Sequence, residues 1–340
     1  MKHAIKDEFI RLDHGSGGEL SYEIVEKLFA PAFGSPELLA GHDGAIMAGI
    51  SGAIAFSTDT FVVDPLFFPG GSIGDLAVNG TVNDVAVCGA KPLYLSAGFV
   101  LEEGFPLKDL AAVVSHMAAA AKQAGVAIVT GDTKVVPRRA ADKVFINTAG
   151  IGRVFDGVAI APRRAEPGDA ILCSGTVADH GVAVLLARND LGLSADIRSD
   201  TAPLNGLVEA IITAVRDVHV LRDITRGGLS SAANEIARKC GFGITLNEAA
   251  IPIAPAVAGA CSLLGFDPLH IANEGKLIAI VPADSAARAL SAMQAHPLGR
   301  QAAVIGRVTA ENPGVVLLTA RSGGARLLPM LTGEQLPRIC

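Results

Sequence analysis

The sequence predicts a two-domain protein in which helices and strands alternate within each domain. With 340 residues the chain exceeds what one hydrophobic core usually holds, so two domains of roughly 150 residues are expected. Hydrophobic residues make up 50% of the chain and aromatic residues only 4%, so Ala, Val, Ile and Leu must build the cores. The tetrapeptide IGRV closes a strand-like apolar run at 151–154 and again at 305–308, which indicates that both halves end alike.

The first half contains five predicted elements. The pattern favours a strand at 53–58, a helix at about 72–89, a helix at 106–125, and strands at 126–130 and 143–148. The first strand delivers Asp59 at its carboxyl end, and the second helix stops at Gly125. The first helix is apolar except for a polar stripe that needs a partner; its members are Asp75, Asn79 and Asn83.

The second half begins after a segment at 155–167 that mixes Pro, Gly and charged residues, and the domain boundary is expected there. A strand at 276–281 and a helix at 284–296 follow before the second IGRV copy. The longest uncharged run, 249–266, is interrupted by Pro and Gly. We interpret it as a strand end, a turn and a short buried helix, and not as a membrane span.

The formal net charge of −6 lies entirely in one stretch. Residues 28–90 contain six acidic residues and no Lys or Arg, and the remaining 28 acidic residues balance the 28 basic ones. This distribution excludes a basic nucleic-acid surface. Because the N-terminus has no apolar segment of signal-peptide length, we expect a soluble cytoplasmic protein.

Two of these acidic residues lie where a metal ion is expected. Asp59 ends an apolar strand and Asp84 lies in an apolar helix, whereas Glu37 fits a solvated surface. Close carboxylates repel one another unless a cation compensates them. Oxygen ligands without nearby His or Cys suit Mg²⁺, which usually implies phosphate on the substrate. Neither a P-loop nor a Rossmann glycine fingerprint is present.

Four glycine-containing segments offer chemistry, and each also has an ordinary structural interpretation. The segment 14–18, HGSGG, suits an anion-binding nest or a flexible linker. The segment 131–134, GDTK, suits a metal and phosphate contact or a simple turn after a strand. The segment 222–228, RDITRGG, suits phosphate binding or packing. In 273–276, NEGK, Glu274 is a general base or a turn acid.

The five cysteines contain no close pair, so neither a zinc site nor a disulfide framework is indicated. Four lie in apolar runs and are interpreted as small buried side chains: Cys88, Cys173, Cys240 and Cys261. Cys340 ends the tail GEQLPRIC, where Pro337 opposes a helix and an extended, mobile arm is expected. Nothing nearby strongly activates the thiol, so a carrier role fits better than a strong nucleophile.

Taken together, several motifs resemble those of the HypE hydrogenase maturation proteins, carbamoyl dehydratases of the PurM-like superfamily. They are HGSGG, FSTDTFVVDPLFFPGGSIGDL, TGDTKVV, DKVFINTAG, RDITRGG, NEGKL and the terminal PRIC. The resemblance implies a PurM-like fold of the α/β and α+β classes. Its parts would be an N-terminal mixed-sheet dimerisation domain at 1–155, a C-terminal α+β domain at 156–311, and a C-terminal strand with a flexible tail at 312–340.

The resemblance also implies the reaction. A HypF-type carbamoyltransferase would load a carbamoyl group onto Cys340, ATP would phosphorylate the amide oxygen, and loss of phosphate would leave a thiocyanate. Its cyanide would pass to iron on a HypC–HypD complex, for a nickel-iron hydrogenase. Lys134 would stabilise the transferring phosphoryl group, and Glu274 would remove the amide protons.

The same resemblance implies a homodimer that binds ATP and Mg²⁺ in the cleft between its domains. Mg²⁺ would be held by Asp43, Asp59, Asp84 and Asp132. ATP would contact Gly15, Ser16, Gly17, Gly18, Asn83, Thr133, Arg226, Gly227 and Gly228.

Two rival functions remain open on the sequence. The first is another ATP-dependent synthetase or kinase of the same superfamily, which would not need a terminal cysteine. The second is a non-enzymatic scaffold that uses the tail to dock partners, which predicts no ATP turnover.

Overall fold

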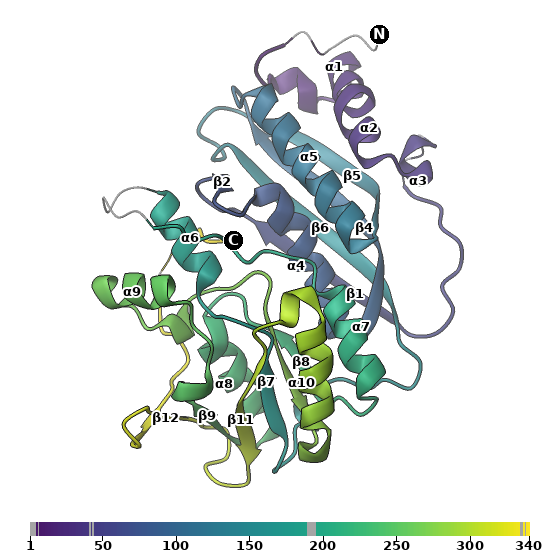
Figure 1. The fold of residues 1–340 in the computed structure, drawn as a ribbon. Coiled ribbons are helices and arrows are strands. Elements are labelled where there is room, and N and C mark those ends of the chain that lie inside the picture. Colours follow the sequence, from purple (N-terminus) through teal and green to yellow (C-terminus); the bar gives the residue numbers. More distant parts are fainter. Residues whose placement is uncertain are drawn as a thin grey trace.

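Figure 1 shows the two domains of the computed structural model, each built around its own sheet. The structure describes residues 5, 7–40, 42, 44–188, 195–333, 336 and 338–340. Within these ranges the strands of a four-stranded sheet lie at 54–154 and those of a seven-stranded sheet at 170–327. A ribbon of β2 (Phe67–Phe68) and β3 (Gly71–Ser72) precedes the first long helix. The predicted two-domain fold is confirmed.

The sheet of the N-terminal domain has the order β1-β6-β4-β5. Of these neighbours, β4 and β5 run parallel and the others antiparallel. The helices α4 and α5 cover one face of the sheet (Figure 1) and bury its apolar side chains. The bounds are β1 (Ile54–Phe61), β4 (Ala90–Glu102), β5 (Ala127–Val136), β6 (Val144–Val154), α4 (Ile73–Val87) and α5 (Leu107–Ala124).

A chain of short helices packs beside the same face, over β5. Phe29 anchors it, because its ring lies 4.8 Å from the ring of Phe99 on β4, measured between centroids. The helices are η1 (Leu12–Gly15), α1 (Glu19–Ile24), a π-helical turn (Val25–Phe29), α2 (Ala30–Phe33) and α3 (Pro36–Leu39).

The opposite face of the N-terminal sheet is exposed along β1. Ile54 and Phe56 are 54% and 67% exposed, and Thr58 and Thr60 on the same face are exposed as well. A contiguous strand face of this composition is typical of an interaction surface.

The C-terminal domain has a sheet of order β13-β12-β9-β11-β7-β10-β8, with helices on both faces. The five residues of β10 are all buried, because Ile278 and Ile280 face α8 while their neighbours face α7 and α10. The strands are β7 (Ala170–Cys173), β8 (Val220–Asp223), β9 (Gly243–Asn247), β10 (Leu277–Val281), β11 (Ala303–Thr309), β12 (Val316–Thr319) and β13 (Ala325–Leu327). The helices are α6 (Asp179–Ala187), α7 (Asn205–Ala214), α8 (Gly228–Cys240), α9 (Pro255–Leu264) and α10 (Ala286–Ala295).

Three predicted strand ends of the N-terminal domain are wrong. The strand β6 continues beyond Thr148 to Val154. The strand β1 continues through Asp59 to Phe61, and β5 continues through Gly131–Lys134 to Val136. Both extensions pair with neighbouring strands, Asp59 with Thr148 and Asp132 with Gly98. Hydrogen bonds to the neighbouring strand thus outweigh the tendency of the sequence GDTK to form a turn.

The run at 249–266 contains a turn and the short helix α9, as predicted, but the predicted strand end is wrong, because β9 stops at Asn247 and a 3-10 turn over Glu248–Ala250 follows it. Both IGRV copies lie in strands, at the end of β6 and within β11. In the ranges that the structure describes, no helix combines the length and apolar composition needed to span a bilayer.

The polar stripe on α4 finds its partners. Asp75 accepts a hydrogen bond from Ser72 at 2.8 Å, within the N-terminal domain. Asn79 donates to Thr201 at 3.1 Å. Asn83 donates to the main-chain carbonyls of Ala202 (3.1 Å) and Glu274 (3.3 Å) and accepts from the N–H of Leu204 (2.7 Å). The second half of the stripe therefore joins the two domains.

We predict that Asn83→Ala lowers the free energy of unfolding by about 2 to 4 kcal/mol, because it leaves three buried main-chain groups unpaired. Urea denaturation followed by circular dichroism measures the loss. Asn79→Ala is the matched comparison, because Asn79 makes a single interdomain bond, and its loss should be smaller. Equal stability of the wild type and Asn83→Ala would contradict this account of the domain junction.

Candidate active site

Four carboxylates surround the cleft between the domains. Asp59 on β1 and Asp84 on α4 come from the N-terminal domain; Asp223, at the end of β8, and Glu274 come from the C-terminal domain. Burial raises the pKa of Asp84 despite a hydrogen bond from Ser57 at 2.7 Å, and the Asp59 charge adds to the rise. Asp223 is 4% exposed, and burial followed by the Asp84 charge raises its pKa to about 7.

The carboxylates of Asp59 and Asp84 lie on the side of the sheet that α4 covers. Gly80 on α4 allows this approach, since a Cβ there would lie 2.8 Å from the Phe61 ring and 3.8 Å from the Asp59 carboxylate. Cations near the cluster are few: Arg226 lies 3.9 Å from Asp59, and Arg222 lies 3.3 Å from Asp223. The cluster therefore retains uncompensated negative charge.

These residues fit a magnesium site only in part. Among the described residues, no three His, Cys, Asp or Glu side chains converge as a preformed metal cage. Mg²⁺, however, is usually held by one or two carboxylates, with substrate phosphates and water as the other ligands. Asp59 and Asp84, with Asp223 beside them, suit that kind of site. Asp43, a predicted ligand, lies outside the described residues.

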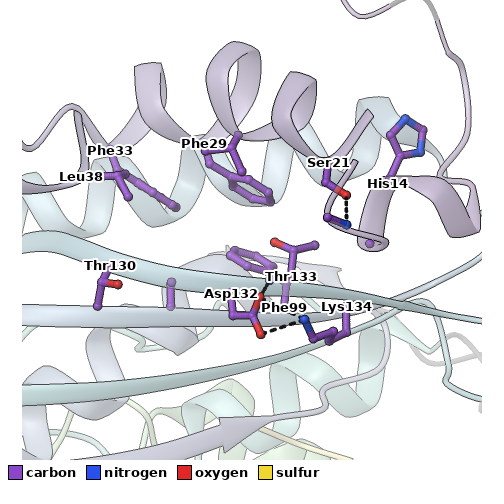
Figure 2. A pocket seen from close by; sticks show the side chains of 15 residues that line it. His14, Ser21, Phe29, Phe33, Leu38, Phe99, Thr130, Asp132, Thr133 and Lys134 are labelled. Carbon is purple, nitrogen blue, oxygen red and sulfur yellow. Dashed lines mark hydrogen bonds and ion pairs between the residues drawn. The ribbon is translucent and has the colours of Figure 1, made fainter. Parts of the chain in front are cut away.

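Asp132 does not share a metal ion with Asp59 and Asp84 of the same chain, contrary to the prediction. It lies on β5, at the sheet edge opposite β1, which is about 14 Å away at three strand spacings. Figure 2 shows Thr133 pointing toward the short N-terminal helices and the Asp132–Lys134 pair on the other side of the strand. The pair is 3.3 Å apart, and the two side chains are 71% and 65% exposed.

The glycine-rich segment lies against β5, next to Thr133. A Cβ on Gly15 would meet the N atom of Val135 at 2.4 Å, so only glycine fits there. Gly17 has a positive φ of 81° and donates to Ser21 at 2.9 Å, while Ser16 donates to Asp13 at 3.0 Å and Gly18 precedes α1. Gly15, Gly17, Thr133 and Lys134 line one cavity of 190 Å³ with the phenyl rings of Phe29 and Phe99 (Figure 2).

The last residues, for which an extended, mobile arm was expected, lie between the two domains, near α6 and α4 (Figure 1). The N–H groups of Val62 and Asp64, just after β1, donate to the main-chain oxygens of Cys340 (3.2 Å) and Arg338 (3.1 Å). Ile339 is 6% exposed and packs into the N-terminal core, together with Cys340. The described residues 338–340 are therefore docked, because main-chain pairing and an apolar side chain hold them. Arg338 has a positive φ of 53°, so the chain bends there and is not fully extended.

Docking brings the Cys340 thiol to Glu274. Burial raises the pKa of the thiol well above its ordinary range, and the neighbouring Glu274 and Asp59 raise it further. Burial also raises the pKa of Glu274 well above its ordinary range, and Asp200 and Asp223 add to the rise. Oε1 of Glu274 is buried without a hydrogen-bond partner among the described residues. The carboxyl group is therefore placed to meet a polar group carried on the thiol.

Arg226 and Gly227 line a cavity of 260 Å³ that also contains Cys340. Gly227 and Gly228 have positive φ angles of 75° and 60°. A Cβ on Gly228 would lie 2.6 Å from the carbonyl oxygen of Ile271, so this glycine is required by packing. Gly227 and Arg226 remain open toward the cavity.

Several residues of the site were missed or misassigned by the sequence analysis. Asp223 ends an apolar strand, the same feature that singled out Asp59, and could have been found in this way. Asn83, a predicted ATP contact, uses its amide on three main-chain groups of the domain junction. His180 and Asp200, which contact the docked tail and the Glu274 segment, carry no motif.

Most of the chain is similar to proteins of one known family. Residues 41–154 match the N-terminal domain model of AIR synthase related proteins, and residues 166–318 match the C-terminal one. The carbamoyl dehydratase HypE of Azotobacter vinelandii is 52% identical over 336 residues, which cover 99% of this chain and 98% of that protein.

Two solved structures extend the comparison. The hydrogenase maturation protein HypE in complex with ATP superposes with a TM-score of 0.93 at 50% identity, over 97% of this chain and 99% of that one. The HypE of a HypE–HypF complex superposes with a TM-score of 0.80 at 46% identity, over 92% and 100%. The chain belongs to the AIR synthase related proteins and, within them, to the HypE family of carbamoyl dehydratases.

Proposed function

We propose that this protein uses ATP to dehydrate a carbamoyl group on the Cys340 thiol to a thiocyanate, for the cyanide ligands of a nickel-iron hydrogenase. The observation that carries the proposal is the docked tail, which places the last thiol of the chain against Glu274 in a cleft of carboxylates. The amide oxygen attacks the γ-phosphorus of ATP, ADP leaves, and one N–H proton is lost. The C–O bond then breaks, phosphate leaves, and loss of the second N–H proton completes the C≡N bond.

Glu274 is the proposed base for the N–H protons. A carboxylate of ordinary pKa is a weak base at neutral pH, and its raised pKa makes Glu274 a stronger one once it is ionised. Its Oε1 has no hydrogen-bond partner among the described residues, and the carboxyl group lies near the Cys340 thiol, which supports a role as proton acceptor for the carbamoyl nitrogen.

Asp59 and Asp84 are the proposed holders of Mg²⁺, with Asp223 as a third carboxylate near them. When bound, the ion would offset the phosphate charge and that of the carboxylates. Arg226 and Gly227 lie beside the thiol, where an arginine side chain and a main-chain N–H can hold the transferring phosphoryl group. The crystal structure of the related HypE in complex with ATP supports a nucleotide at this fold.

Lys134 and Asp132 reach the reaction, in this proposal, from the second subunit of a homodimer. Within one chain they lie on the sheet face opposite Asp59 and at the other edge. Two copies that pack through the exposed sheet face with two-fold symmetry bring β5 of one copy to β1 of the other. Thr133 and the segment 15–18 would then lie near the nucleotide of the partner's cleft.

The proposed partners follow from the same reaction. A HypF-type carbamoyltransferase supplies the carbamoyl group, which is supported by the HypE–HypF complex of a relative. A HypC–HypD complex receives the cyanide. A carrier thiol has to stay reduced, which fits a cytoplasmic location.

We predict that protein carbamoylated on Cys340 loses the mass of one water at its C-terminal peptide when Mg-ATP is added, with one ADP and one phosphate formed. Mass spectrometry of the peptide and a phosphate assay measure this. Cys340→Ala should lack the mass change but still bind ATP, whereas Cys88→Ala, at another cysteine, should behave like the wild type. ATP binding without any mass change would contradict the proposed dehydration and would favour a kinase or a scaffold.

We predict that Lys134 and Glu274 of one active site come from different subunits. Heterodimers of Lys134→Ala with Glu274→Gln, isolated through two affinity tags, should recover about half the wild-type turnover, because one of two sites is intact. A heterodimer of wild type with the doubly substituted chain is the control and should be inactive. The reverse pattern would show that Lys134 acts within its own chain.

We predict that Asp84→Asn raises the Mg²⁺ concentration for half-maximal ADP formation roughly tenfold, because a neutral amide is a weaker ligand than a carboxylate. A Mg²⁺ titration at fixed ATP measures the change. Asp156→Asn, at a surface pair with Arg153, is the control and should titrate like the wild type. An unchanged titration for Asp84→Asn removes this residue from the metal site.

A further inference from the structure

The docked tail is held by its main chain on both sides of the penultimate residue. From the N-terminal domain, Val62 and Asp64 donate to the main-chain oxygens of Cys340 and Arg338. From the C-terminal domain, Arg188 donates to the Arg338 carbonyl at 3.0 Å, and Nε2 of His180 lies 2.7 Å from the Ile339 carbonyl oxygen. None of these contacts involves the Cys340 thiol.

His180 is fixed in one tautomer by a short chain of hydrogen bonds. A carbonyl oxygen only accepts, so the nitrogen that faces Ile339, Nε2, must carry the proton. Nδ1 then accepts from the Ser199 hydroxyl at 2.8 Å, and the Ser199 oxygen accepts from the N–H of Thr201 at 3.1 Å. The ring is completely buried, packs edge-on against Phe68 with centroids 5.4 Å apart, and burial lowers its pKa. A neutral imidazole therefore satisfies all its partners here.

The segment that orients His180 also orients Glu274. Asp200, next to Ser199, accepts from the N–H of Glu274 at 3.0 Å and from Lys276 at 3.1 Å. Two adjacent residues thus help to position the two groups that meet in the cleft, the Cys340 thiol and the Glu274 carboxyl group. Ser199 orients His180, which holds the tail, and Asp200 binds the main chain of Glu274.

We propose that His180 is a positioning residue for the carbamoyl carrier: its neutral Nε2–H holds the Ile339 carbonyl and so aligns the group on Cys340 with Glu274. The positioning role rests on the proposed dehydration. The hydrogen bond between His180 and Ile339 is present whatever reaction the protein catalyses. Because His180 binds the main chain beside the thiol, it holds the tail equally well whether the thiol is free, carbamoylated or a thiocyanate. The tail must also leave the cleft for loading, and His180 adds only one neutral hydrogen bond to the contacts that have to be released.

The first experiment measures tail release without any ATP chemistry. Iodoacetamide alkylates Cys340, and cleavage after Glu334 releases the peptide QLPRIC for mass spectrometry. Alkylation of Cys340 should be about tenfold faster in His180→Ala, because the Ile339 carbonyl and Ser199 hydroxyl lose their partner. Ser199→Ala should give a smaller increase, since the tautomer is then no longer fixed. His180→Gln, whose amide N–H can donate to the same carbonyl, should restore part of the protection.

The matched control is His219→Gln, which replaces another buried histidine of the same domain, paired with Asp169 and remote from the tail. It should leave the alkylation rate unchanged. Unchanged alkylation in both His180→Ala and Ser199→Ala, with circular dichroism showing folded proteins, overturns the proposal whatever the protein's reaction is.

The second experiment links the contact to catalysis. Single turnover of carbamoylated His180→Ala with Mg-ATP should form thiocyanate about tenfold more slowly, while loading by a carbamoyltransferase should be as fast as in the wild type or faster. A merely structural defect would slow both steps together and overturns the positioning role. Faster alkylation with normal thiocyanate formation also overturns it, because the docked position would then not be the reacting one.

Discussion

The active site depends on one buried side chain of the domain junction. Asn83 binds three main-chain groups of the C-terminal domain, among them the Glu274 carbonyl, and the next residue on α4 is Asp84. A buried amide that satisfies three partners has a well-defined position, because any shift leaves polar groups unpaired. Asn83 therefore helps to hold the N-terminal carboxylates next to the Glu274 segment.

That geometry sets the electrostatics of the cleft. Asp84, Asp223 and Glu274 all have raised pKa values, with burial as the main cause and the neighbouring carboxylates as the second. In the absence of a cation these carboxylates bind protons more readily than exposed carboxylates do. Bound Mg²⁺ would favour the ionised forms instead, so loading of the metal and phosphates would also make Glu274 available as a base. In the proposed reaction, this coupling would place nucleotide binding before proton removal.

Sequence reasoning found the local features and missed those that depend on three-dimensional contacts. The helix α4, its polar stripe and the two domains were predictable, because the spacing of apolar residues determines which face is buried. The continuation of β1 and β5 was not, since it depends on partners such as Thr148 and Gly98 that lie far along the chain. The separation of Asp132 from Asp59 was not predictable either, because it follows from the strand order.

The tail shows why the remaining site residues have no sequence pattern. Pro337 and the polar residues of GEQLPRIC predict an extended arm, but they do not predict where the arm binds. Its position is set by main-chain hydrogen bonds and by the burial of Ile339, and main-chain partners impose little on the residues that bind them.

A carrier needs this kind of contact. The thiol passes through several chemical states, and a site that recognised one state would release or trap the others. Recognition through the backbone avoids this, and the raised pKa of the docked thiol keeps it protonated and unreactive until it is loaded. In the cleft the thiol is protected, and outside it regains an ordinary pKa and can accept a carbamoyl group. In the proposed reaction, the movement that delivers the substrate would therefore also control when the thiol is a nucleophile.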